Sequence, residues 1–240
     1  MKETRYFYDP QLSGSLPEEE AKHVVRVLRM SEGDEINIMD GNGTFHRAVI
    51  TAAANHRCLY RVMESELQER PWNGHIHLAV APTKLNERME WLAEKATEIG
   101  WDEVTFLDCQ FSERSTIKTE RIGKIVVSAV KQSHKAWMPR VNGMTSFKEF
   151  VLAQEKKVGQ QNFICHCYEG DKPFLMDQVC QSGDALVMIG PEGDFSTAEV
   201  DFAREHGFIA VSLGNSRLRT ETAALAAVHM MQIVKSFLRF

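Results

Sequence analysis

The chain of 240 residues can form one large domain or two small ones, and its 43% hydrophobic and 25% charged residues are typical of a globular protein rather than a disordered one. The net charge of −5 argues against indiscriminate binding to nucleic acids. No apolar run reaches the ~18–20 residues that cross a bilayer, and the N-terminus has no apolar h-region of a secretory signal. The five cysteines are irregularly spaced, which does not suggest a disulfide framework. We therefore expect a cytoplasmic chain with no membrane partner.

The first seventy residues alternate between apolar and polar side chains, as half-buried strands do. The expected strands are residues 5–9, 35–41, 44–51 and 57–64, with a glycine-rich turn, "DGNGT", between the second and third. One helical insert, residues 18–30, places apolar residues on a single stripe. We therefore predict a small β-rich domain over residues 1–70, a barrel, followed by a polar linker at residues 68–74.

After this segment the pattern changes to an alternation of strands and helices, which predicts a mostly parallel sheet with helices on both faces. The expected strands are residues 75–81, 103–109, 162–167, 184–190 and 208–213. The expected helices are residues 86–100, 119–134 and 196–207 and a last helix from about Thr220. The sequence thus predicts an α/β domain over residues 74–240, the second of two.

Two glycine loops follow strands of this domain, where open α/β sheets bind ligands. They are "IGPEGDFS" at residues 189–196 and the start of "LGNSRLRTETAALAA" at residues 213–227. Neither loop contains a phosphate-binding motif, so kinase, NTPase and dinucleotide-binding functions lose support. Such loops suit a ligand held by backbone groups, for example an adenosine-type cofactor. Each loop can also be an ordinary strand-to-helix turn, which uses glycine anyway.

Arg217 and Arg219 stand beside Glu221 where the last helix begins. The helix dipole favours Glu221 there, but it disfavours the two cations. The arginines are therefore expected to hold an anion or a polar substrate. Four alanines in the first turns leave room for a ligand or another backbone to approach.

Positive charge is concentrated in two segments despite the acidic total. Residues 110–140 carry seven Lys or Arg against two acids, and residues 215–240 carry four against Glu221 alone. These segments could form one basic face, or they could be solvated helices.

A different cluster consists of Cys165, His166 and Cys167. Core packing is favoured over metal binding for it, because no second Cys/His pair lies at zinc spacing. We expect no metal.

Together these features resemble the RsmE family, the uridine N3-methyltransferases of 16S ribosomal RNA within the SPOUT superfamily. "HVVRVLRM" and "DGNG" resemble the family's PUA-like RNA-binding β-barrel, and "KLNERMEWLAEKATEIG" resembles a helix of its catalytic domain. "SERS", "IGPEGDFS" and "LGNSRLRTETAAL" resemble its three most specific loops. The chain departs from the family at Asp194, where a glycine is usual, and at His134 and Lys135, where Gly-Arg is usual.

The resemblance implies a C-terminal SPOUT domain with a trefoil knot, S-adenosyl-L-methionine as cofactor and a homodimer with sites at the subunit interface. By matching motifs, the cofactor would be bound by Ile189, Gly190, Gly193, Leu213, Gly214, Leu218 and Thr220.

The expected reaction is methylation of N3 of a uridine in 16S ribosomal RNA of the small subunit. Arg219 would stabilise the charge that develops on the uracil, with Arg114 as a second or trans-subunit candidate. Glu221 is the candidate general base, and a purely dipolar role for it is an equal alternative. RNA phosphates would be contacted by Arg26, Arg29, Arg121, Lys124, Lys131, Lys135, Arg140 and Arg217.

Two other functions stay open from the sequence. One is a methyltransferase with another RNA target, such as 2′-O methylation of transfer RNA ribose. The other is a non-enzymatic RNA-binding protein that assists ribosome assembly, although the intact glycine loops and the run from Arg217 to Glu221 speak against it.

Overall fold

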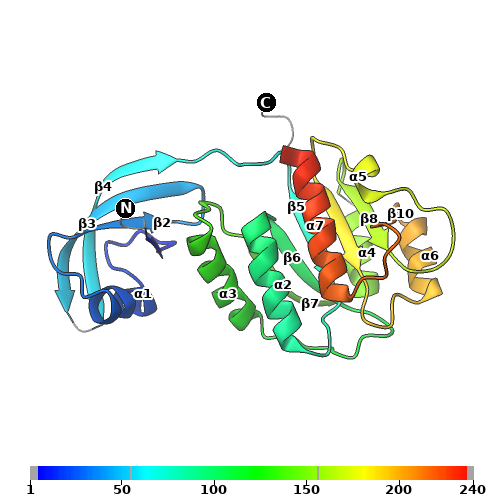
Figure 1. Ribbon diagram of the computed structural model, residues 1–240, viewed down its shortest axis with the longest axis horizontal. Helices are drawn as coiled ribbons and strands as arrows, with labels where there is room; N and C mark the ends of the chain where they lie inside the picture. Colours follow the sequence, from blue (N-terminus) through cyan, green and yellow to red (C-terminus); the bar gives the residue numbers. More distant parts are fainter. Residues whose placement is uncertain (1–4, 55, 156, 237–240) are drawn as a thin grey trace. The chain divides into compact units, whose positions relative to one another are not determined.

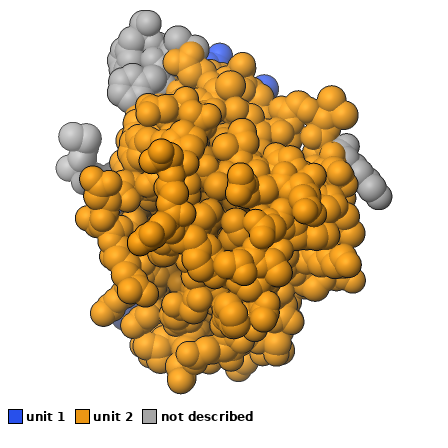
Figure 2. Space-filling view, turned by 90° about the vertical axis from the view of Figure 1, so that its right-hand side faces the viewer, with its two compact units in different colours: residues 1–70, 127–138 blue, residues 71–126, 139–240 orange. Residues whose placement is uncertain are grey.

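The computed structural model describes residues 5–54, 56–155 and 157–236, and they divide into two units (Figure 1; Figure 2, blue and orange). Unit 1 comprises residues 1–70 and 127–138, and unit 2 comprises residues 71–126 and 139–240. Residues 127–138, which the sequence analysis assigns to the second domain, are therefore grouped with the N-terminal residues. None of the helices in the described ranges is long and apolar enough to cross a membrane.

Unit 1 is built on a four-stranded sheet of order β1-β2-β3-β4. The strands are β1 (Tyr6–Tyr8), β2 (Glu35–Met39), β3 (Thr44–Ala54) and β4 (Arg57–Leu67). β1 pairs parallel to β2 and the other pairs are antiparallel. The helical insert is α1 (Glu18–Lys22), which continues as a π-helical turn, η1 (His23–Val27). Apolar side chains from the sheet and the insert, among them Phe7, Val24 and Ile38, form one buried cluster, so the expected strands and helix are confirmed.

The end of α3 (Thr119–Gln132) explains one departure from the family pattern. His134 has a φ of 51°, which is the left-handed region that favours glycine. The Lys135 N–H donates to the Val130 carbonyl (3.1 Å) and the His134 N–H to the Lys131 carbonyl (3.4 Å), which is the Schellman ending of a helix. The His134 ring also lies 5.1 Å from the Tyr6 ring. A histidine thus occupies the position at which glycine is the usual residue.

Unit 2 contains six parallel strands in the order β10-β8-β9-β5-β6-β7. The strands are β5 (Ile76–Val80), β6 (Glu103–Asp108), β7 (Arg140–Ser146), β8 (Gln161–Cys165), β9 (Ala185–Ile189) and β10 (Ile209–Val211). β5 and β9 are buried along their whole length, as expected for central strands covered on both faces. The predicted parallel α/β sheet is confirmed.

Helices cover both faces of this sheet (Figure 1). They are α2 (Asn86–Ile99), α4 (Phe147–Glu155), α5 (Leu175–Gln178), α6 (Thr197–Glu205) and α7 (Thr220–Ser236), in addition to the start of α3. α7 packs against α2, β5 and β9, whereas α4 packs against α6, β6 and β7. Ser196 and Glu199 form a capping box at the start of α6.

Three elements and one buried segment were not foreseen from the sequence. β7, α4 and α5 were missed; β7 reads "RVNGMTS", without alternation of apolar and polar side chains, and it is an edge strand paired with β6 alone. The expected linker is not solvated throughout. Trp72 is buried and its indole N–H donates to Asp102 (2.9 Å), while Gly74 lies so close to the Gly183 carbonyl that a Cβ would be 1.8 Å from its oxygen.

Candidate functional site at the carboxyl ends of the strands

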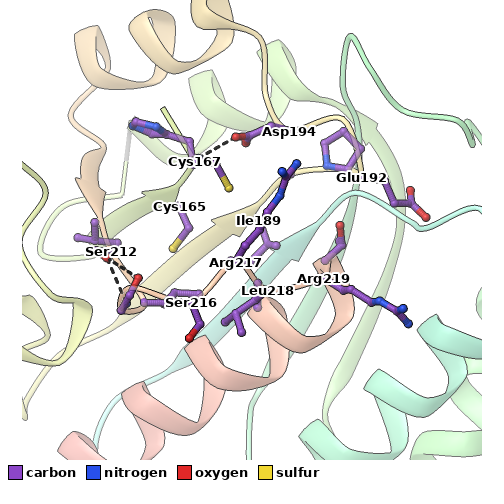
Figure 3. Close-up of a pocket in the computed structure, with 18 of the residues that line it drawn as sticks. Cys165, Cys167, Ile189, Glu192, Asp194, Ser212, Ser216, Arg217, Leu218 and Arg219 are labelled. Atoms are coloured by element: carbon purple, nitrogen blue, oxygen red, sulfur yellow. Dashed lines mark hydrogen bonds between the residues drawn. The ribbon is translucent and has the colours of Figure 1, made fainter. Parts of the chain in front are cut away.

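A cavity of about 860 Å³ lies at the carboxyl ends of β10, β8 and β9, which are neighbours in the sheet (Figure 3). Its walls begin at the last residue of each strand: residues 165–167 at the end of β8, residues 189–194 at the end of β9 and residues 211–220 at the end of β10. Arg88 of α2, Lys172 and Ala223 of α7 complete the lining. A parallel α/β sheet binds its ligands at this edge, and the volume falls in the usual range for small-molecule sites.

All seven residues expected to bind a cofactor line this one cavity: Ile189, Gly190, Gly193, Leu213, Gly214, Leu218 and Thr220. The two glycine loops, far apart in the sequence, therefore form facing parts of a single site. The two loops lie close together because the strands they follow, β9 and β10, are separated in the sheet by β8 alone.

The first loop requires glycine at two positions. A Cβ on Gly190 would lie 3.0 Å from the Phe195 nitrogen and 3.1 Å from a ring carbon of the same residue. A Cβ on Gly193 would lie 3.1 Å from the Phe111 Cβ. Backbone atoms thus form this part of the wall, which presents N–H and C=O groups rather than side chains.

The second loop is fixed by a short-range hydrogen bond. Gly214 has a φ of 112°, and its N–H donates to the Ser212 hydroxyl (3.1 Å; Figure 3). The chain then enters α7 at Thr220, where the Ala223 N–H donates to the Arg219 carbonyl (2.8 Å). Ala223 lines the cavity itself, so its small side chain brings the helix backbone close to any bound ligand.

Arg217 and Arg219 lie on the cavity with exposed side chains. Within the described residues, neither guanidinium forms an ion pair or a hydrogen bond. The two side chains point in different directions, Arg217 toward the side of Asp194 and Arg219 away from it (Figure 3). Two unpaired cations thus border one cavity, as expected of groups that receive an anion or a polarised carbonyl oxygen.

Glu221 is buried in the first turn of α7, with 7% of its surface exposed. Arg88 Nε lies 3.6 Å from its Oε1, and Arg88 Nη1 lies 4.0 Å from Glu192 Oε1. The other carboxylate oxygen of Glu221, Oε2, is buried and has no hydrogen-bond partner among the described residues. A buried acceptor without a partner is costly, so a hydrogen-bond donor that reached this oxygen would be bound favourably. Thr220, the preceding residue, lines the cavity, but Glu221 itself is not among the lining residues.

Arg114 is not part of the cavity lining in this chain. Its Nε donates to the Lys84 carbonyl (2.9 Å), and the Lys84 N–H donates to Glu192 (3.1 Å). The "SERS" loop is thereby connected through Lys84 to the first glycine loop. The structure does not bring Arg114 together with Arg219.

The expected RNA-contacting residues differ in how they are engaged. Arg121 forms a bidentate ion pair with Glu90, and Lys131 pairs with Glu20 (2.7 Å). Arg26 Nη2 lies 2.6 Å from His56 Nε2. Arg29 and Arg140 are exposed. Lys124 is exposed and Lys135 is half-buried. Unit 1 holds Arg26, Arg29, Lys131 and Lys135, and unit 2 holds Arg121, Lys124, Arg140 and Arg217.

The preference for core packing at Cys165, His166 and Cys167 is wrong, because all three line the cavity. They stand at the carboxyl end of a predicted parallel strand, and this position could have assigned them to the ligand site from the sequence. Burial raises the pKa of Cys165 to about 12, which keeps the thiol protonated near neutral pH. In residues 5–54, 56–155 and 157–236 no three His, Cys, Asp or Glu side chains are arranged to hold a metal ion.

Two family models match the chain. The RNA methyltransferase domain model matches residues 70–232, and the RNA methyltransferase PUA domain model matches residues 16–62. The first covers the whole cavity and more than half of the chain.

Solved structures and curated relatives agree with these matches. A probable rRNA-methyltransferase from Porphyromonas gingivalis is 41% identical, with a TM-score of 0.91 over 98% of this chain and 100% of its own. The ribosomal RNA small subunit methyltransferase E of Neisseria gonorrhoeae, solved with S-adenosyl methionine bound, is 28% identical, with a TM-score of 0.84 over 97% and 98% of the two chains. The protein of that name from Synechocystis is 31% identical over 86% of this chain and 68% of its own.

Proposed function

Because this chain belongs to the ribosomal RNA small subunit methyltransferase E family, we propose that it methylates N3 of a uridine in 16S ribosomal RNA of the small subunit. The observation that carries the proposal is the convergence of both glycine loops on one cavity at the carboxyl ends of three parallel strands. The relative from Neisseria gonorrhoeae binds S-adenosyl methionine, which makes this the cofactor of choice here.

The cavity suits S-adenosylmethionine by its size and its lining. About 860 Å³ is enough for a nucleoside joined to an amino acid, and a Cβ at Gly190 or Gly193 would lie only 3.0–3.1 Å from neighbouring atoms. We assign cofactor binding to the seven residues of the two loops that the sequence analysis names. The bound cofactor supplies an activated methyl group on a sulfonium.

The protein must orient the uracil and receive its N3 proton. Glu221 is the proposed base, because its Oε2 has no hydrogen-bond partner among the residues that the structure describes, while Arg88 stands beside its Oε1. Arg219 is the proposed cation for the negative charge that spreads to the uracil oxygens. Arg114 lies outside the lining, so we keep it as a residue that acts in trans, from a second subunit of a homodimer.

The remaining parts of the proposal concern architecture and location. We propose residues 1–70 as an RNA-binding domain and residues 74–240 as a SPOUT domain, in agreement with the ranges of the two family models. β10 lies at the edge of the sheet, next to β8. From β10 the chain returns to the middle of the sheet, where α7 packs against β5 and β9, and this path is compatible with a trefoil knot. The five cysteines are free, which suits a cytoplasmic enzyme.

Nucleoside analysis tests the function directly. Isolated small subunits are incubated with the protein and S-adenosylmethionine, and the 16S RNA is digested and measured by mass spectrometry. We expect 3-methyluridine. A 2′-O-methylated nucleoside would instead support another target, and a protein that binds no S-adenosylmethionine in calorimetry would be reduced to an RNA-binding role.

A further inference from the structure

Asp194 adopts a backbone conformation that most residues avoid. Its φ is 66°, in the left-handed region, and it is the fourth residue after Gly190 in the first glycine loop. Glycine occupies this region at no steric cost, whereas Asp and Asn do so at a modest one. The side chain must therefore provide an interaction that offsets this cost.

The Asp194 carboxylate accepts hydrogen bonds from two backbone N–H groups. Oδ1 accepts from Phe195 (2.8 Å) and Oδ2 accepts from Cys167 (2.7 Å; Figure 3). Phe195 follows β9, and Cys167 follows the neighbouring strand β8. Charge-assisted bonds of this length are among the stronger hydrogen bonds in proteins. The carboxylate thus connects the ends of two adjacent strands.

These strand ends are two walls of the cavity. Cys165, His166 and Cys167 line it on one side, and the loop from Gly190 to Asp194 lines it next to them. The chain after β8 forms no helix or strand before the bridge between Phe174 and Ser212, so few backbone bonds fix this wall. A second connection joins the same segments: the Tyr168 hydroxyl donates to the Phe195 carbonyl (2.7 Å).

We propose that Asp194 is a positioning residue, which holds the wall after β8 against the first glycine loop in the shape that receives S-adenosylmethionine. The inference rests on the proposed function of the cavity. The carboxylate acts through the backbone of Cys167 rather than by chemistry of its own. Preorganisation of this kind lowers the cost of ordering the site when the ligand binds.

Asp194→Gly isolates the contribution of the carboxylate. Glycine keeps the left-handed backbone without strain and removes both hydrogen bonds. We expect the Kd for S-adenosylmethionine, measured by calorimetry, to rise about tenfold, which is ~1.4 kcal/mol. The kcat at saturating cofactor should stay within about twofold, because the variant leaves Arg219 and Glu221 unchanged.

Two further variants separate positioning from a general loss of structure. Asp34→Asn weakens a bond of the same kind in unit 1, where Asp34 Oδ2 accepts from the Ser31 N–H (2.7 Å), and should leave the Kd unchanged. Tyr168→Phe removes the second connection between the two walls. Its effect on the Kd should be larger in the Asp194→Gly background than in the wild type, because the two bonds secure the same segments.

The outcomes are distinguishable from failure of the proposed function. If the wild-type protein binds S-adenosylmethionine and the folded Asp194→Gly variant binds it equally well, the positioning role is refuted. A lowered kcat with an unchanged Kd would refute it too. Absence of binding by the wild type would refute the function assigned to the cavity instead.

Discussion

Arg88 Nε lies 3.6 Å from Glu221 Oε1, so that a cation of α2 stands against a buried carboxylate in the first turn of α7. The pairing leaves Glu221 Oε2 without a hydrogen-bond partner among the described residues. A carboxylate that served only the helix dipole would have no need of burial or of an unpartnered oxygen. This geometry is the reason for the proposed role of Glu221 as a base, which the first prediction tests.

The first prediction concerns Glu221→Gln. The amide keeps the size of the side chain but cannot accept a proton, so we expect kcat to fall by ~10²–10⁴, the usual contribution of a general base. The Kd for S-adenosylmethionine should change less than about threefold. Single-turnover methylation of small subunits and calorimetry measure the two quantities.

Glu120→Gln is the matched control, because Glu120 is also the second residue of a helix, α3, and follows a threonine there too. Loss of the helix-dipole interaction costs ~0.3–1 kcal/mol of stability in either case. Equal small effects of the two substitutions on kcat would remove Glu221 from the proton transfer.

The second prediction concerns Arg219→Ala. Removal of the cation should lower kcat by ~10²–10³, as loss of an oxyanion-stabilising donor does, while cofactor binding stays mostly intact. Arg217→Ala should instead raise the KM for RNA and leave kcat nearly unchanged. The assignment is wrong if Arg219→Ala binds S-adenosylmethionine tenfold more weakly and methylates normally once saturated.

The sequence predicted the site better than it predicted parts of the fold. The seven positions that the family resemblance implies for the cofactor all line one cavity, and three of them, Gly190, Gly193 and Gly214, are glycines whose pattern is visible in the sequence. β7 was missed because its sequence, "RVNGMTS", shows no alternation of apolar and polar side chains. Trp72 and Arg88 were missed because their partners, Asp102 and Glu221, are distant in the chain and are brought near only by packing.

The third prediction compares two glycines of unit 2. Gly190→Ala places a Cβ 3.0 Å from the Phe195 nitrogen, and we expect a loss of ~1–3 kcal/mol in stability together with weaker cofactor binding. Gly123→Ala lies in α3 with no atom within 4 Å of the new Cβ, and should stabilise the protein by ~0.5–1 kcal/mol. Urea unfolding measures both, and a stabilised Gly190→Ala variant would contradict the loop geometry.

The fourth prediction concerns the pH dependence of stability and the buried His77. This histidine is the second residue of β5 and does not line the cavity. Burial lowers the pKa of His77 to about 4, and the nearby Glu103 carboxylate opposes that shift. Its Nε2 lies 2.8 Å from Thr105 Oγ1. Because the folded state binds the proton less tightly than the unfolded state, whose pKa is 6.5, the stabilisation is complete above pH ~6.5. It is lost as the pH falls from there toward 4.

Urea titrations at several pH values measure this dependence. The free energy of unfolding should fall on acidification from pH ~6.5 by up to ~1.4 kcal/mol per pH unit from this group. His77→Gln stays neutral and should flatten the curve in that window. A variant with the wild-type slope would assign the acid sensitivity to another group.

The fifth prediction separates paired from unpaired cations among the residues proposed to contact RNA. Arg121 is engaged by Glu90 in a bidentate ion pair, whereas Arg140 is exposed at the start of β7 without a partner in the described part of the chain. An arginine that binds a phosphate releases a counterion, so each such contact steepens the dependence of log K on log salt by ~0.7–0.9. Arg140→Ala should therefore lower this slope by nearly one and weaken binding to all sequences alike. Arg121→Ala should lower it far less, because Glu90 already neutralises that guanidinium. Fluorescence anisotropy with a 16S fragment over a range of salt concentrations measures both slopes. Equal changes of slope in the two variants would show that RNA displaces Glu90 from Arg121. A wild-type affinity that does not depend on salt would exclude phosphate contacts by these cations.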